Sequence, residues 1–172
     1  MSTTSPAITI KPLSDDSRAW VEVRSEQLFN GPFVISKGSK LEPAKLPGFV
    51  AMNGDDCIGL ATFRIDGKEC ELVTIDALVR REGVGTRLLA AVEAEAIQAG
   101  CRRIWLITTN DNLDALRFYQ RRDYTIAAIH VNALKQSRKL KPTIPLVGNY
   151  GIPMNHEIEL EKFLHPGIRS RR

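Results

Sequence analysis

A glycine-rich turn in the middle of the chain constrains the fold more than any other feature. The turn, Arg80 to Arg87 (RREGVGTR), follows an apolar run, Cys70 to Leu78, that is typical of a buried strand. After it, Thr86 to Ala99 has apolar residues at helical spacing, and Gly100 stands where helices commonly end. A strand, a glycine turn and a helix N-terminus in this order bring unpaired backbone N–H groups together. The sequence therefore predicts an anion site, although a plain turn with solvated arginines would look similar.

Alternating and apolar runs on both sides of this turn predict a sheet with helices. The expected strands are Ala7 to Leu13, Phe49 to Met52, Cys57 to Ile65, Cys70 to Leu78, Ile104 to Thr108, Tyr124 to Val131 and Glu157 to Leu160. Further helices are expected from the caps at Ser14 to about Phe29, and from Asp111 or Asn112 to about Arg122. Two long loops, Gly31 to Gly48 and Lys139 to Pro153, complete the chain.

This order of elements predicts an α/β (α+β) fold with one central sheet. We expect a mixed, mostly antiparallel sheet of about seven strands with helices on both faces. The three strands immediately before the glycine turn, Phe49 to Met52, Cys57 to Ile65 and Cys70 to Leu78, are expected to form an antiparallel meander, because tight turns join them. The change to parallel pairing is expected at the strand Cys70 to Leu78, since a helix connects it to the next strand.

Composition limits the class of protein. The 172 residues are 43% hydrophobic and 26% charged, which fits one globular domain, and the net charge of +4 is below what nucleic-acid binding usually shows. The chain has no signal-like N-terminus and no apolar run long enough for a bilayer. We therefore expect a cytoplasmic domain over residues 8–164, a flexible N-terminus at 1–7 and a flexible basic tail at 165–172, with no nucleic-acid or membrane partner.

Motifs for other chemistries are incomplete or missing. The three cysteines and three histidines lack metal-ligand spacing, so no metal is expected. The turn lacks the third glycine of a dinucleotide fingerprint and the Lys-Ser/Thr of a Walker A loop. Asp111 follows the next strand, where a ribose-binding acid can stand, so a nicotinamide site is weakened but stays open.

Two motifs together resemble a known family. Arg80-Arg-Glu-Gly83-Val-Gly85 matches the pattern Gln/Arg-x-x-Gly-x-Gly/Ala, and Asn112 to Tyr124 (NLDALRFYQRRDY) resembles N-x-x-A-x-x-F-Y-x-x-x-G-[FY]. Both belong to the GNAT (Gcn5-related) N-acetyltransferase superfamily, and the resemblance runs from about Ile8 to Leu164, towards an uncharacterised bacterial branch. Asp123 replaces the usual glycine, but Asp tolerates the left-handed conformation better than most residues.

The resemblance implies an acyltransferase that uses acetyl-CoA and no metal. It implies direct attack by a primary amine of a small molecule or peptide in a ternary complex, with the protein a monomer or homodimer. The residues expected at the cofactor are Ala77, Leu78, Val79, Arg80, Arg81, Glu82, Gly83, Val84, Gly85, Thr86, Arg87, Asn112, Ala115 and Phe118. A non-catalytic acyl-CoA sensor and a nicotinamide-binding protein are the alternatives.

Glu71 and Tyr119 are the expected catalytic residues. Glu71 interrupts an apolar strand, where burial makes a carboxylate a better proton acceptor, and it aligns with the general base of histone-acetylating members. Asp76 is the second candidate, and strand alternation predicts that it faces away from Glu71; ordered water is a third. Tyr119 matches the family tyrosine that protonates the CoA thiolate. The acceptor itself is not defined by the sequence, although it should contact the two long loops.

Overall fold

Nine strands and four α-helices make up the described part of the computed structural model, which covers residues 7–79 and 82–164. The strands are β1 (Ile8–Pro12), β2 (Val34–Ser36), β3 (Ser39–Leu41), β4 (Gly48–Asn53), β5 (Asp56–Asp66), β6 (Glu69–Ala77), β7 (Arg103–Thr109), β8 (Thr125–His130) and β9 (Glu157–Phe163). The helices are α1 (Asp15–Phe29), α2 (Val84–Gln98), α3 (Leu113–Gln120) and α4 (Ala133–Leu140), with short 3-10 helices η1 (Pro43–Lys45) and η2 (Asn149–Gly151). Apart from Ala7, the predicted flexible N-terminus and basic tail lie outside the described residues. None of the described helices is long and apolar enough to cross a membrane.

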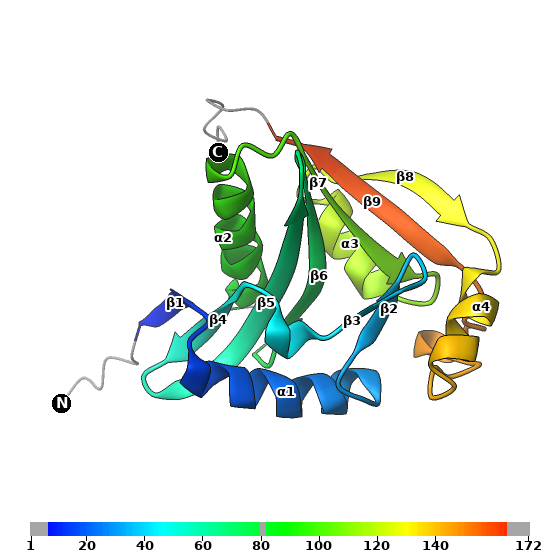
Figure 1. The fold of residues 1–172 in the computed structure, drawn as a ribbon, viewed down its shortest axis with the longest axis horizontal. Helices are drawn as coiled ribbons and strands as arrows, with labels where there is room; N and C mark the ends of the chain where they lie inside the picture. Colours follow the sequence, from blue (N-terminus) through cyan, green and yellow to red (C-terminus); the bar gives the residue numbers. More distant parts are fainter. Residues whose placement is uncertain (1–6, 80–81, 165–172) are drawn as a thin grey trace.

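Seven strands form the central sheet, in the order β1-β4-β5-β6-β7-β9-β8. All neighbours are antiparallel except β6 and β7, so the predicted mixed sheet and the position of its change in direction are confirmed. The parallel pairing covers only Glu69 to Glu71 against Arg103 to Trp105. Beyond it the two strands spread apart (Figure 1), which leaves the second half of β6 without a neighbour on that side.

Helices cover both faces of the sheet, as the sequence predicts (Figure 1). Val50 and Leu60 pack against Val21 of α1, whereas the next residues along each strand, Ala51 and Ala61, belong to the larger core beneath α2 and α3. Successive residues of a strand point to opposite faces, so each strand contributes to two cores. The sheet is therefore buried on both sides near its centre, where the site lies.

Helix ends follow signals that the sequence carries. Ser14 caps α1 in a reciprocal pair with Ser17, and Gly100, with φ of +79°, ends α2. Gly83 has φ of +74° and precedes the first residue of α2, so the predicted helix begins two residues earlier than expected. Asp123 adopts the predicted left-handed conformation, with φ of +67°. These positions are local, which is why sequence alone locates them.

Both long loops contain structure that the sequence analysis did not predict. Gly31 to Gly48 holds the β2–β3 hairpin and η1, and α4 reaches into the start of the segment Lys139 to Pro153. The two strands of the hairpin are three residues each, too short for a periodic signal. Helix α4 is polar and buries only Leu134 and Ser137. The last strand, β9, also runs three residues past its predicted end.

A β-bulge in β6 overturns the predicted orientation of Asp76. Between Leu60 and Arg64, β5 alternates regularly, so Leu60, Thr62 and Arg64 all face α1. Their partners in β6 are Asp76, Thr74 and Glu71, respectively. The extra residue, Val73, shifts the register, so Glu71 and Asp76 point to the same face although five positions separate them. The prediction that they face apart is wrong because strict alternation does not survive a bulge.

Candidate active site

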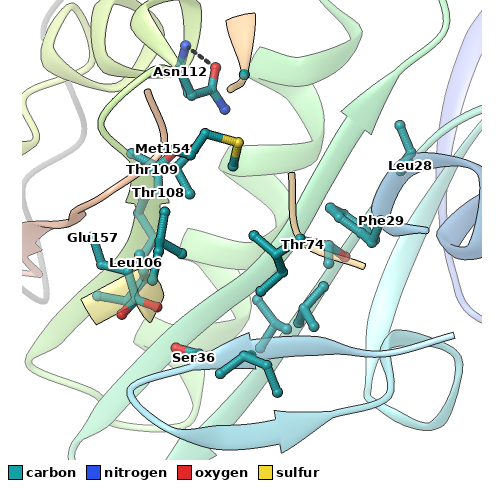
Figure 2. A pocket seen from close by; sticks show the side chains of 18 of the residues that line it. Leu28, Phe29, Ser36, Thr74, Leu106, Thr108, Thr109, Asn112, Met154 and Glu157 are labelled. Atoms are coloured by element: carbon teal, nitrogen blue, oxygen red, sulfur yellow. Dashed lines mark hydrogen bonds between the residues drawn. The ribbon is translucent and has the colours of Figure 1, made fainter. Parts of the chain in front are cut away.

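A cavity of about 540 Å³ opens where β6 and β7 part. Its walls come from β6, β7, the end of α1, strand β2 and the segment 141–154 (Figure 2). Four predicted site residues lie together on its surface, supplied by β6 and by α3 with its N-cap: Glu71, Asn112, Ala115 and Tyr119. The cavity thus joins the expected catalytic residues to the α3 side, where cofactor residues are expected.

Glu71 is held in the cavity wall by two side chains that the sequence analysis missed. Its carboxylate is buried, accepts a hydrogen bond from Arg64 Nε at 2.5 Å and accepts another from the Ser36 hydroxyl. Arg64 lies opposite Glu71 in β5, and Ser36 comes from the unpredicted β2 strand. The burial of Glu71 excludes a solvent-facing side chain at this position. The ion pair with Arg64 fixes the carboxylate at the cavity.

Asp76 has a different environment from Glu71. Its carboxylate forms a salt bridge with Arg24 of α1 at 2.7 Å, and it is not among the residues that line the cavity. Although both acids share one face of the sheet, only Glu71 reaches the cavity. The geometry therefore favours Glu71 as the group that meets an acceptor.

Tyr119 presents a protonated hydroxyl at the cavity. Its side chain is buried, and burial raises the pKa of Tyr119 above its ordinary value. The ring packs edge-on against Phe118 at 5.1 Å and at a tilt against Tyr124 at 5.4 Å. Within the described part of the chain, its hydroxyl has no hydrogen-bond partner. A phenol in this state is able to donate a proton to a ligand.

The N-terminus of α2 lies where the sequence predicts an anion site. Gly83 supplies no capping side chain, so the N–H groups of the first helical turn have no partner within the helix. A side chain on Gly85 would begin 3.4 Å from the Phe118 ring, so glycine leaves the approach to these groups open. Arg122 donates to the Thr86 hydroxyl at 2.6 Å and adds positive charge that the sequence analysis missed.

Other predicted cofactor residues divide by environment. Glu82, Thr86 and Arg87 are exposed near this helix end, Val84 is buried in the core, and Arg80 and Arg81 lie outside the described residues. Leu78 donates its N–H to the carbonyl of Ile58 at 2.9 Å, so this group is committed to β5. By alternation, Ala77 and Val79 direct their backbone groups to the free edge of β6.

Asn112 has a structural role in addition to lining the cavity. Its Oδ1 accepts the N–H of Ala115 at 3.2 Å, which makes it the N-cap of α3 (Figure 2). This contact fixes the first turn of α3, and with it Ala115 and Phe118, beside the cavity and the start of α2. The cap that sequence reasoning offered as an alternative role is therefore present.

Buried charges that were not predicted as catalytic also line the cavity. Asp111 accepts two hydrogen bonds at Oδ2 from the backbone and side chain of Asn149, at 2.8 and 2.9 Å. Glu157, at the start of β9, accepts one from Ser137 at 3.1 Å, and Lys141 donates to the Phe33 carbonyl at 2.5 Å. The sequence predicted Asp111 only as a possible ribose-binding acid or helix cap after a strand. It predicted Glu157 only as the first residue of a strand, with no role in a site. In the described ranges, no cluster of three acidic, histidine or cysteine side chains could hold a metal ion.

Comparisons with known proteins agree with the fold and the motifs. The model of the "Acetyltransferase (GNAT) family" matches residues 14–124, which is more than half of the chain. The chain therefore belongs to the GNAT acetyltransferase family and is an acyltransferase.

Individual relatives and solved structures resemble the chain over most of its length. The uncharacterised protein YdhI of Bacillus subtilis (strain 168) is 46% identical over 70% of this chain and 76% of its own. An IAA acetyltransferase from Bacillus cereus has a TM-score of 0.68 at 18% identity, covering 92% of this chain and all of its own. A GNAT family acetyltransferase from Elizabethkingia anophelis with acetyl-CoA bound has a TM-score of 0.69 at 19% identity, covering 91% of this chain and 98% of its own.

Proposed function

We propose that the protein transfers the acetyl group of acetyl-CoA to a primary amine of a small molecule or peptide, by direct attack of the amine in a ternary complex. One observation carries this proposal. The uncapped N-terminus of α2, the free edge of β6 and a cavity containing Glu71 and Tyr119 lie together where β6 and β7 part. The arrangement provides an anion site, a backbone to pair with, a proton acceptor and a proton donor.

The chain's residues fit CoA in two places. The N–H groups at the start of α2 suit the pyrophosphate, with positive charge from Arg122 and Arg87. The free edge of β6, through Ala77 and Val79, suits the amide groups of the pantetheine arm, which pair as an added strand does. The acetyl-CoA bound to the Elizabethkingia anophelis structure of similar fold supports this choice of ligand. When bound, it supplies an activated thioester for acyl transfer.

Glu71 is the group that we assign to the acceptor amine. An ammonium ion has no lone pair, so the acceptor must lose a proton before it attacks a carbonyl carbon. Glu71 is buried and is fixed at the cavity by Arg64 and Ser36, and it accepts this proton directly or through a water molecule. Asp76 is less suited because Arg24 occupies it outside the cavity.

Tyr119 is the group that we assign to the leaving sulfur. A thiolate leaves more readily when a donor protonates it, and the Tyr119 hydroxyl is protonated and without a partner in the described residues. Tyr119 and Glu71 both line the cavity, so donor and acceptor groups surround one space. The attacking nitrogen loses two protons: one goes to Glu71, and the other replaces the proton that Tyr119 gives to sulfur. The reaction then ends with an amide, neutral CoA thiol and a proton released from Glu71.

The proposed cofactor site is tested by thermal unfolding with and without acetyl-CoA. Binding to the folded state raises the melting temperature, so we expect a rise for the wild type and none for Gly83→Asp or Gly85→Asp, because a carboxylate then occupies the anion site. Gly67→Asp is the matched control: Gly67 also has positive φ (+58°) with open space around it, but it lies in the β5–β6 turn. Absence of a shift in the wild type would overturn the proposal.

A further inference from the structure

Two buried carboxylates on the cavity wall form no salt bridge with the described residues. Asp111 is 1% exposed, and its Oδ1 makes no hydrogen bond while Oδ2 is held by Asn149. Glu157 is 3% exposed, accepts hydrogen bonds from the Ser137 hydroxyl and the Lys37 backbone N–H, and has the charges of Lys37 and His130 nearby. A buried polar atom without a partner is costly, so Asp111 Oδ1 indicates a group that the folded chain itself does not supply.

The neighbouring buried acids are compensated, which sets these two apart. Glu71 is paired with Arg64, and Glu159, two residues along β9 from Glu157, forms salt bridges with Lys37 and Arg103. The cavity's only described lysine, Lys141, donates to the Phe33 carbonyl and forms no salt bridge with either carboxylate. Burial raises the pKa of Glu157, and the hydrogen bonds from Ser137 and the Lys37 backbone, together with the charges of His130 and Lys37, oppose this only in part. A further cation beside it would stabilise its charged form.

Asp111 and Glu157 lie at the same end of the sheet, on the wall across from Glu71. Glu157 pairs with Thr109 at the end of β7, and Asn110 then binds the backbone of His156 at 2.9 Å. Asp111 follows directly, so the β7–β9 side carries both of these acids while β6 carries Glu71. Figure 2 shows Glu157 on one side of the cavity and Thr74 of β6 on the other.

Apolar side chains form part of the surface between these two walls, together with polar ones such as Thr74 and Asn112. Leu28, Phe29 and Val34 contribute from α1 and β2, and Ile144, Pro145 and Met154 contribute from the segment 141–154. A hydrocarbon chain suits such a lining, since it loses little hydration there. Cationic nitrogens suit the acids at either side.

We propose that the acceptor is a diamine or polyamine, with the amine to be acetylated at Glu71, a second cationic nitrogen at Asp111 and Glu157, and an alkyl spacer between them. This inference rests on the proposed function and narrows its acceptor class. A monoamine with the same chain fills the apolar part of the cavity but leaves both acids unpaired. The preference is therefore for the second charge, not for chain length.

Calorimetric titration of the protein–CoA complex tests this proposal without needing turnover. The probes are cadaverine, an α,ω-diamine, and pentylamine, which has the same carbon chain and one amine. We expect cadaverine to bind about tenfold or more tightly than pentylamine, the usual effect of a charged hydrogen bond. Glu157→Gln should remove most of this difference and leave pentylamine affinity within about twofold.

The matched control is Glu161→Gln, which removes a carboxylate from the same strand outside the cavity and should leave both affinities unchanged. If Glu157→Gln does not fold, Asp111→Asn serves instead and should act in the same direction. Equal affinity of the two amines for the wild type, or an equal loss of both in the variant, would overturn the inference. Failure of CoA to bind would overturn the proposed function alone, because titration of the CoA-free protein still measures the diamine preference.

Discussion

Replacing Glu71 with Gln tests the chemical part of the account with a defined magnitude. The substitution keeps the size of the side chain and an oxygen that accepts from Ser36, but it removes the charge that pairs with Arg64 and the basic oxygen at the cavity. A positioned general base contributes about 10²–10⁴ to a rate, which is about 2.7–5.5 kcal/mol of barrier. We therefore expect kcat/KM to fall by at least about a hundredfold.

Stability and cofactor affinity should change much less. Loss of a charge-assisted hydrogen bond costs about 1.5–3 kcal/mol at most, and partial exposure of Arg64 reduces this. The start of α2 is untouched, so the shift in melting temperature caused by acetyl-CoA should persist. Steady-state kinetics and thermal unfolding of the same preparation separate these effects.

Asp76→Asn is the matched control for Glu71→Gln. It removes a carboxylate from the same strand and face, breaks an ion pair of similar length with Arg24, and leaves the cavity lining unchanged. We expect kcat/KM to stay within about threefold of the wild type. The reasoning would be refuted if Asp76→Asn lost as much activity as Glu71→Gln, or if Glu71→Gln kept wild-type turnover and pH dependence.

Three further substitutions have expected outcomes. Tyr119→Phe should lower kcat by about a hundredfold with acceptor KM unchanged, whereas an equal loss of cofactor affinity would mean that Tyr119 only packs. Gly148→Ala should lower the free energy of unfolding in urea by about 1–3 kcal/mol, because the new Cβ would overlap Asp111 Oδ2 and lie 2.8 Å from Met154. Unchanged stability would contradict this close contact. Burial alone would raise the pKa of Glu159, but hydrogen bonds from its cationic partners lower it to about 2. The charged Glu159 therefore adds about 3 kcal/mol to the free energy of unfolding above pH 4.5, and this contribution is lost as the pH falls to about 2. Glu159→Gln should remove this contribution and flatten acid unfolding in that range, and an unchanged acid profile would count against it.

Features set by neighbouring residues were predictable from the sequence. Gly100 and Asp123 both adopt the left-handed conformation that their positions at helix ends suggest. The seven strands of the central sheet and its single parallel pair follow from periodicity and connection length. These signals do not depend on what the segments later contact.

Features set by tertiary contacts were not predictable. The extra residue Val73 turns the Asp76 side chain to the opposite face of the sheet from the one that strict alternation predicts. A single bulge residue of this kind cannot be recognised from the hydrophobic pattern of the strand. The β2–β3 hairpin is stabilised across the fold, through Ser36 on Glu71 and Lys37 on Glu159. Its two strands have three residues each, which is too few to show a hydrophobic periodicity in the sequence.

The candidate site divides in the same way. Glu71 and Tyr119 carry recognisable signals, a charge inside an apolar strand and a motif on a helix, and both line the cavity. Arg122 and Glu157 do not, because an arginine on a helix and a glutamate in a strand are ordinary until the chain folds. Their surroundings, the start of α2 and the end of β7, come from segments distant in sequence.

The most direct test of the central claim follows the acetyl group itself. The protein is incubated with acetyl-CoA labelled in the acetyl carbons and a panel of mono- and diamines, and mass spectrometry measures the amines and CoA. The account predicts labelled N-acetylamine in equal amount to free CoA, dependent on the wild-type protein and nearly lost in Glu71→Gln. Acetyl-CoA binding with no labelled amide from any amine would contradict it.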